Sequence, residues 1–133
     1  MSPKTKLLFI AVAISSNVSA AVIYWDGGTG SIAANGDALS QGGTGTWNGS
    51  INNWDAGSGK AHVSWAKRFT AVFAGTSGTV TTGAALTVVG MTFNTDGYII
   101  TGTVSNPITL KGRANLSIGD GRTLNSNAFV VMK

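Results

Sequence analysis

The sequence contains no cysteine and no glutamate, and it has one histidine and two prolines among its 133 residues. Without cysteine the chain cannot form a disulfide, which is a common source of stability in small exported domains. Stacking of regular units is an alternative source, because each unit buries its face against the next. All five acidic residues are aspartates, and this scarcity of titratable groups limits the chemistry that the chain can perform.

Long hydrophobic runs are also absent. The longest run, residues 7–14, has eight apolar residues, whereas a transmembrane helix needs about 20. Lys4 and Lys6 precede this run, and small polar residues follow it as far as Ala20. This order is typical of a secretory signal peptide, with small side chains just before the cleavage point. We therefore predict a signal peptide over residues 1–20, cleavage between Ala20 and Ala21, and an exported chain with no membrane span after its removal.

Charge of either sign is sparse. The nine Lys and Arg residues include Lys4 and Lys6 of the predicted signal, so seven remain against five aspartates. These charges are scattered, and Lys67-Arg68 is the one adjacent basic pair. Such a distribution does not provide the basic patch that nucleic acids or anionic membranes require, so we expect neither as a partner.

The chain is instead rich in glycine, threonine and short apolar segments. All four tryptophans lie within residues 21–72 and none within 73–133. No stretch beyond the predicted signal keeps the period of about 3.6 residues that marks an amphipathic helix. We therefore expect an all-β protein, with a Trp/Gly-rich N-terminal cap segment over residues 21–72 and regular strands over residues 73–133.

Short segments of β-forming residues recur through the second part, separated by glycine, asparagine or proline. Most read apolar–hydroxyl–apolar, which places two apolar side chains on one face of a strand and the hydroxyl on the other. The segments are residues 79–81, 86–88, 91–93, 98–100, 108–110 and 116–118.

The spacing of these segments bears on the architecture. Residues 86–88 recur as 108–110, 22 residues later, and residues 91–93 recur as 116–118, 25 residues later. Tyr98 maps onto Thr123 with the same offset of 25. Offsets of this size fit one coil of a parallel β-helix, and three-residue segments are shorter than the strands of about 5–6 residues usual in globular sheets. We therefore favour a parallel β-helix, with an antiparallel β-sandwich or meander as the alternative.

In a β-helix the apolar members of these segments would point inward and stack in ladders, while threonine and serine would face solvent. The residues that we expect to form the ladders are Leu86, Val88, Phe93, Ile99, Ile108, Leu110, Leu116 and Ile118.

Several segments together resemble the start of passenger regions in bacterial proteins with autotransporter-associated β-strand repeats. The resemblance rests on residues 43–49, 53–55 and 71–75, on Trp65, and on the segment Gly90-Met91-Thr92-Phe93-Asn94-Thr95-Asp96-Gly97-Tyr98-Ile99-Ile100-Thr101-Gly102. It implies a right-handed parallel β-helix that serves as a passenger or surface stalk, located extracellularly or at the cell surface.

The sequence departs from this family at its end. Family members usually continue through many more coils and often end in an outer-membrane barrel, whereas this chain stops at residues 129–133 without either feature. We therefore expect an N-terminal fragment of a longer autotransporter-like protein, truncated at the C-terminus, for which a periplasmic location is the alternative. Further chain of the same passenger is then an expected partner.

Catalysis needs groups that titrate or coordinate, and few are present. His62 has no Gly-x-Ser-x-Gly motif to accompany it, and we interpret it as an ordinary loop residue. Each aspartate lies in its own turn context, where turn preference alone accounts for it. The sequence therefore predicts no enzyme, no catalytic residue, no cofactor and no metal site. The five aspartates are Asp26, Asp37, Asp55, Asp96 and Asp120.

The tryptophans leave two interpretations open. Trp47, Trp54 and Trp65 could close the first coil as an apolar cap, or their exposed rings could stack on sugars as a platform for surface glycans. We favour the cap, and with it a non-enzymatic structural passenger. A glycan-binding or adhesive module is the alternative, and a fragment of a polysaccharide-active β-helix enzyme is a weaker one.

Overall fold

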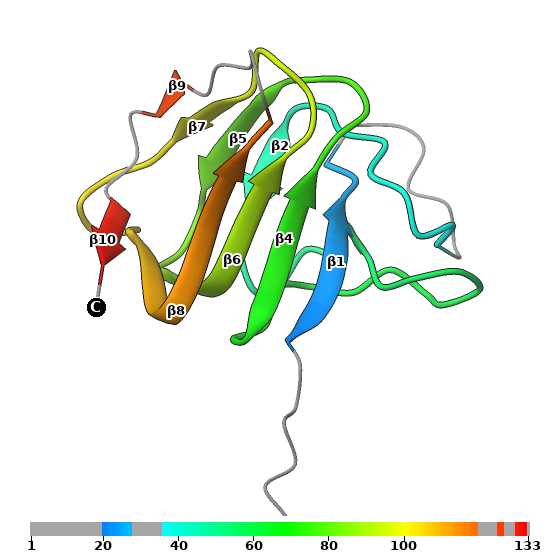
Figure 1. Cartoon of the computed structure of the whole chain (residues 1–133), viewed down its shortest axis with the longest axis horizontal. Helices are drawn as coiled ribbons and strands as arrows, with labels where there is room; N and C mark the ends of the chain where they lie inside the picture. The colour runs from blue at the N-terminus through cyan, green and yellow to red at the C-terminus, as the bar shows by residue number, and fades with distance from the viewer. Residues whose placement is uncertain (1–19, 28–35, 120–124, 127–129, 133) are drawn as a thin grey trace, which may run out of the picture.

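The computed structural model describes residues 20–27, 36–119, 125–126 and 130–132, and within these ranges the chain is all-β with no helix (Figure 1). The expected all-β class is thus confirmed. Among the described residues no helix has the length and apolar character needed to cross a membrane. The predicted signal peptide falls outside these ranges apart from Ala20, and its cleavage stays a prediction. The strands are β1 (Ala21–Trp25), β2 (Gly45–Trp47), β3 (Trp54–Asp55), β4 (Phe69–Phe73), β5 (Thr79–Thr82), β6 (Leu86–Phe93), β7 (Ile99–Thr101), β8 (Ile108–Ile118), β9 (Asn125–Ser126) and β10 (Val130–Met132).

The strands form two sheets. The larger has the order β10-β8-β6-β4-β1-β3, in which all neighbours are parallel except the antiparallel pair β1 and β3. The smaller has the order β2-β5-β7-β9, and all its neighbours are parallel. From β4 onward, consecutive strands alternate between the two sheets, so they are not joined as hairpins of one sheet. Figure 1 shows the smaller sheet lying behind the larger one.

The expected spacing of the repeats agrees with the strand register. Leu86 pairs with Ile108 and Met91 pairs with Leu116, which are the offsets of 22 and 25 residues read from the sequence. The change of offset lies at a register shift between Val88 and Gly90, where β8 has three more residues than β6. The Tyr98–Thr123 correspondence lies outside the described residues, and the adjacent Ile99 pairs with Asn125 at an offset of 26.

One apolar core lies between the sheets and receives side chains from both. Phe73 of β4 and Phe93 of β6 stack at 4.6 Å with nearly parallel rings, and Val80 and Ile100 enter from the smaller sheet fully buried. Five of the eight expected ladder residues lie in this core, each at most 3% exposed. They are Leu86, Val88, Phe93, Ile108 and Leu110.

The other three expected ladder residues are exposed, and the expectation was wrong for them. Ile99 is 37% exposed because alternation over residues 98–100 turns Tyr98 and Ile100 inward instead. Leu116 and Ile118 are 44% and 40% exposed although they lie in register with the buried Met91 and Phe93. Among the described residues, β10 pairs with residues 108–110 of β8 and not with this later part, so no paired strand covers them on that side.

The turn after β4 fixes a loop that matters for the site described below. Gly75 has a φ of 64°, and a Cβ there would lie 2.5 Å from the carbonyl oxygens of Ser40 and Gln41. Only glycine allows this approach without strain. The Thr76 amide can then donate to the Gln41 carbonyl at 3.0 Å, which holds the loop before β2 against the β4–β5 turn.

Tyr98 provides a test of core packing at alkaline pH. Its side chain is fully buried and its hydroxyl donates to the Ala74 carbonyl at 2.6 Å. Burial raises the pKa of Tyr98 to about 12 from the ordinary 10.0, with a smaller contribution from the negative Asp26. The folded state thus favours the neutral phenol. The resulting contribution to the free energy of unfolding is complete below pH 10 and is lost as pH rises through about 12.

We expect the free energy of unfolding to fall by about 2–3 kcal/mol on this account between about pH 10 and pH 12. Urea unfolding at about pH 9 and about pH 11.5 would measure the loss. The control is Tyr98→Phe, which keeps the ring and lacks the titrating group. An equal alkaline loss in this variant would show that Tyr98 is not its source.

Candidate functional site

The three tryptophans considered as a ligand platform are all buried. Trp47 and Trp54 have no exposed surface and Trp65 is 6% exposed. Their rings contact one another edge-on or tilted, with centroids 4.7–5.1 Å apart, and Trp25 joins them at 5.0 Å from Trp54. This placement favours the cap interpretation, because a ring must present its face to solvent to stack on a sugar.

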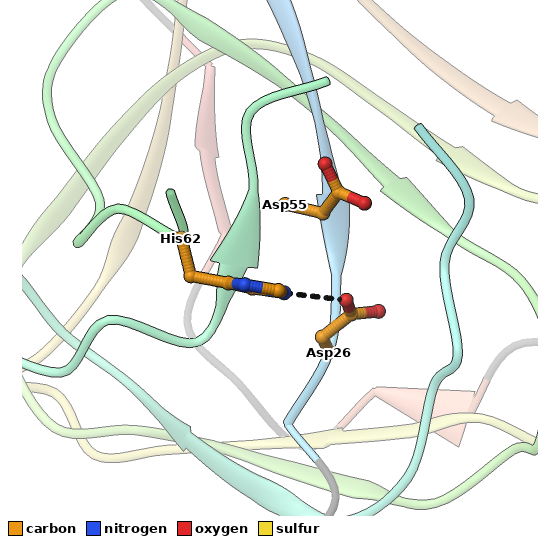
Figure 2. Close-up of side chains that lie close together, drawn as sticks. All are labelled: Asp26, Asp55 and His62. Carbon is orange, nitrogen blue, oxygen red and sulfur yellow. Dashed lines mark hydrogen bonds and ion pairs between the residues drawn. The ribbon is translucent and has the colours of Figure 1, made fainter. Parts of the chain in front are cut away.

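A compact group of polar side chains lies beside this aromatic cluster. Asp26, Asp55 and His62, here called the Asp–His cluster, bring one ligand atom each to within 4.8 Å of one another. Figure 2 shows the His62 ring pointing toward the two carboxylates, with its Nε2 end directed at Asp26. The exposed fraction is 6% for Asp26, 0% for Asp55 and 9% for His62, so the cluster belongs to the interior.

Strand pairing brings the two aspartates together. Trp25 pairs with Trp54 across the antiparallel strands β1 and β3. Asp26 follows the first of these tryptophans and Asp55 follows the second. The pairing of β1 with β3 therefore brings the two carboxylates close together. An isolated antiparallel bridge between Trp54 and Val63 then places His62 next to them.

The carboxylate of Asp26 links two loops. Its Oδ1 accepts a hydrogen bond from the backbone amide of Gln41 at 2.6 Å, and its Oδ2 lies 2.8 Å from His62 Nε2. An ionised carboxylate can only accept, so the Nε2–H of His62 donates this bond. The second ring nitrogen of His62, Nδ1, is buried and has no hydrogen-bond partner among the described residues.

Asp55 is held by the backbone. Its Oδ2 accepts the amides of Asp37 and Ala38 at 2.7 and 2.9 Å, and its Oδ1 accepts the Gly57 amide at 2.6 Å. Burial alone would raise the pKa of this carboxyl, but the three backbone donors stabilise the charged form and bring its pKa below the ordinary 3.8. Asp55 is therefore an ionised, fully buried acceptor that joins the segment at residues 37–38 to the turn at Gly57.

From the sequence these residues are expected to be unrelated, His62 as an ordinary loop residue and each aspartate in its own turn. The structure instead places Asp26, Asp55 and His62 in one buried cluster. A signal for the aspartates was present, since Trp-Asp occurs at both 25–26 and 54–55 and nowhere else in the chain. Nothing comparable indicated His62.

The cluster offers charge and hydrogen-bonding groups, but no serine hydroxyl bonds to His62 among the described residues, so it does not form a Ser–His–Asp arrangement. The remaining aspartates lie elsewhere. Asp37 accepts from Leu39 and Gln41, Asp96 lies in the turn before β7, and Asp120 falls outside the described residues. The architecture is thus an all-β fold of two sheets, with an aromatic cluster and a buried polar cluster near the β1–β3 edge of the larger sheet.

Comparison with known proteins relates the chain to an autotransporter adhesin. It is 39% identical over 110 residues to the adhesin BmaC autotransporter of Brucella suis biovar 1 (strain 1330). The match covers 79% of this chain and 3% of the relative, so the chain spans a small part of that protein's length. No family model and no solved structure matches the chain.

Proposed function

We propose that the chain is a non-enzymatic structural passenger segment, exported and located at the cell surface, in which the strands wind as a right-handed parallel β-helix. Its physical role is to form a rigid stalk. Hydrogen bonding between successive coils and inward apolar stacking would supply the rigidity.

The observation that carries this proposal is the register of the parallel strands. The segments at residues 71–73, 91–93 and 116–118 lie directly beside one another across β4, β6 and β8. The segments at 79–81 and 99–101 do the same across β5 and β7. Repeated in-register pairing in two facing sheets is what a coil-on-coil rod requires, and such stacks act as extended scaffolds.

Relationship to an autotransporter adhesin supports export and surface location, and it favours adhesion as a second candidate function for the same segment. Buried tryptophans cannot present a sugar-stacking face in this conformation. An adhesive role would therefore use the outward faces of the strands, and glycans and further chain of the same passenger remain the proposed partners.

Export is tested by expressing the full chain with a C-terminal epitope in a Gram-negative bacterium. We expect the product to leave the cytoplasm, to lose the mass of residues 1–20, and to begin at Ala21 by N-terminal sequencing. The matched control is Leu8→Arg, which interrupts the apolar run and should hold the chain uncleaved inside the cell. A wild-type product that stays cytoplasmic at full length would contradict the proposal.

A further inference from the structure

The Asp–His cluster brings three metal-ligating groups together in the interior. Asp26, Asp55 and His62 each offer one donor atom, and these atoms lie within 4.8 Å of one another. Donors on a tetrahedral zinc ion at about 2.0–2.2 Å lie about 3.5 Å apart. Side-chain movements of about 1 Å would therefore bring all three onto one ion.

The cluster also has a charge imbalance. Two carboxylates are buried, and His62 could balance one negative charge at most. Among the described residues no Lys or Arg forms an ion pair with either aspartate. Backbone amides and His62 satisfy the hydrogen bonding of these carboxylates but leave net negative charge in the interior, and a bound cation would neutralise it.

His62 supplies a second, separate observation. Its side chain is 5% exposed, and its single hydrogen bond to a described residue is the one between Nε2 and Asp26. Nδ1 is buried and has no hydrogen-bond partner in the part of the chain that the structure describes, so the ring has been removed from water without recovering both of its polar contacts there. The ring is therefore held through Nε2, the nitrogen whose end is directed at Asp26 in Figure 2, and this is the atom that would bond to a metal.

The carboxylates are already oriented as metal ligands usually are. Backbone amides hold Asp26 through Oδ1 and Asp55 through both of its oxygens, which is the supporting role that outer hydrogen bonds have in metal sites. Within the described ranges Asp55 Oδ1 accepts one hydrogen bond, from the backbone amide of Gly57, and keeps a lone pair for another contact. Asp26 Oδ2 and His62 Nε2 would exchange their mutual hydrogen bond for bonds to the ion.

The donor set selects the class of ion. Calcium takes six to eight oxygen ligands and magnesium keeps oxygen ligands in an octahedron, whereas one imidazole and two carboxylates suit zinc and related transition metals. We propose that Asp26, Asp55 and His62 bind one Zn²⁺ ion, with water as the fourth ligand, and that this ion links the ends of β1 and β3 to the segment around His62. The site is structural and is independent of the function proposed above.

The test uses the full 133-residue chain without a histidine tag, stripped of metal with a chelator and then titrated with ZnCl₂ by calorimetry. We expect one Zn²⁺ per chain and a rise in Tm of about 5 °C or more at saturation. Cobalt replacing zinc should give the visible absorption bands of a four-coordinate ion. CaCl₂ at the same concentration should leave the Tm unchanged.

Two conservative variants locate the site. His62→Gln and Asp26→Asn keep side-chain volume and should each weaken zinc binding at least about 10-fold. Asp96→Asn, an exchange of an exposed turn aspartate, should bind like the wild type. Absence of saturable zinc binding by the wild-type chain overturns the proposal, and this result does not depend on whether the variants fold. Binding that persists unchanged in both site variants would overturn it equally, since the ion would then lie elsewhere.

Discussion

Replacement of Trp54 by alanine is expected to lower the free energy of unfolding by about 3–5 kcal/mol, because it removes the central ring of the aromatic cluster. Trp54 contacts Trp25, Trp47 and Trp65 with ring centroids 4.9–5.1 Å apart, and it also packs against Phe73. The ring is fully buried, so its loss leaves a cavity that three other large rings cannot fill without moving. For a domain whose whole stability is about 5–15 kcal/mol, this is a large fraction.

Urea unfolding followed by near-ultraviolet circular dichroism would measure the change, since the signal arises from the packed rings themselves. Val104→Ala is the control, because Val104 is 68% exposed and its truncation should change stability by no more than about 0.5 kcal/mol. Comparable stability of the two variants would mean that the indole does not support the core. The same experiment separates cap from platform, because a platform tryptophan could be removed without unfolding the chain.

The repeat spacing could be predicted from sequence because it depends on a local pattern that recurs. Apolar–hydroxyl–apolar segments specify which face of a strand is buried. When such strands pair in parallel, their apolar faces must point to the same side of the sheet. Two different offsets, 22 and 25, gave no indication of where the extra residues lie. The structure places them opposite the register shift between Val88 and Gly90, a position that side-chain alternation alone cannot identify.

For Ile99 the prediction failed because the alternation is ambiguous. Residues 98–100 are Tyr-Ile-Ile, all apolar, so the pattern does not say whether the middle or the flanking side chains point inward. A shift of one residue reverses every side chain in a strand. The core resolves the ambiguity, since Tyr98 packs edge-on against Phe73 and bonds to Ala74, which leaves Ile99 outside.

The Asp–His cluster could not be derived from local pattern for a different reason. Asp26 and Asp55 are 29 positions apart and each is followed within two residues by a glycine, so turn chemistry accounts for both without a contact between them. Their proximity comes from the antiparallel pairing of β1 with the two-residue strand β3. So short a strand leaves almost no periodic signal, although the repeated Trp-Asp pair marks its end.

Removal of the Asp55 side chain should be nearly as damaging as loss of Trp54, although the change is small in volume. Three backbone amides, from Asp37, Ala38 and Gly57, donate to this one carboxylate. Asp55→Ala leaves all three without their acceptor beside the core. Hydrogen bonds to charged groups contribute about 1.5–3 kcal/mol each, and partial rehydration of the loops recovers some of this. We therefore expect a loss of about 3–5 kcal/mol.

Asp55→Asn separates the acceptors from the charge. The amide keeps one oxygen and loses the other as an acceptor, so it should retain part of the network and lose about 1–2 kcal/mol. Amide hydrogen exchange gives the local measurement: the amides of Ala38 and Gly57 should lose protection in Asp55→Ala beyond what global destabilisation explains. Val104→Ala serves as the control here too, since Val104 is 68% exposed. If Asp55→Ala were no less stable than this control, the carboxylate would not be what joins the two loops to the end of β3.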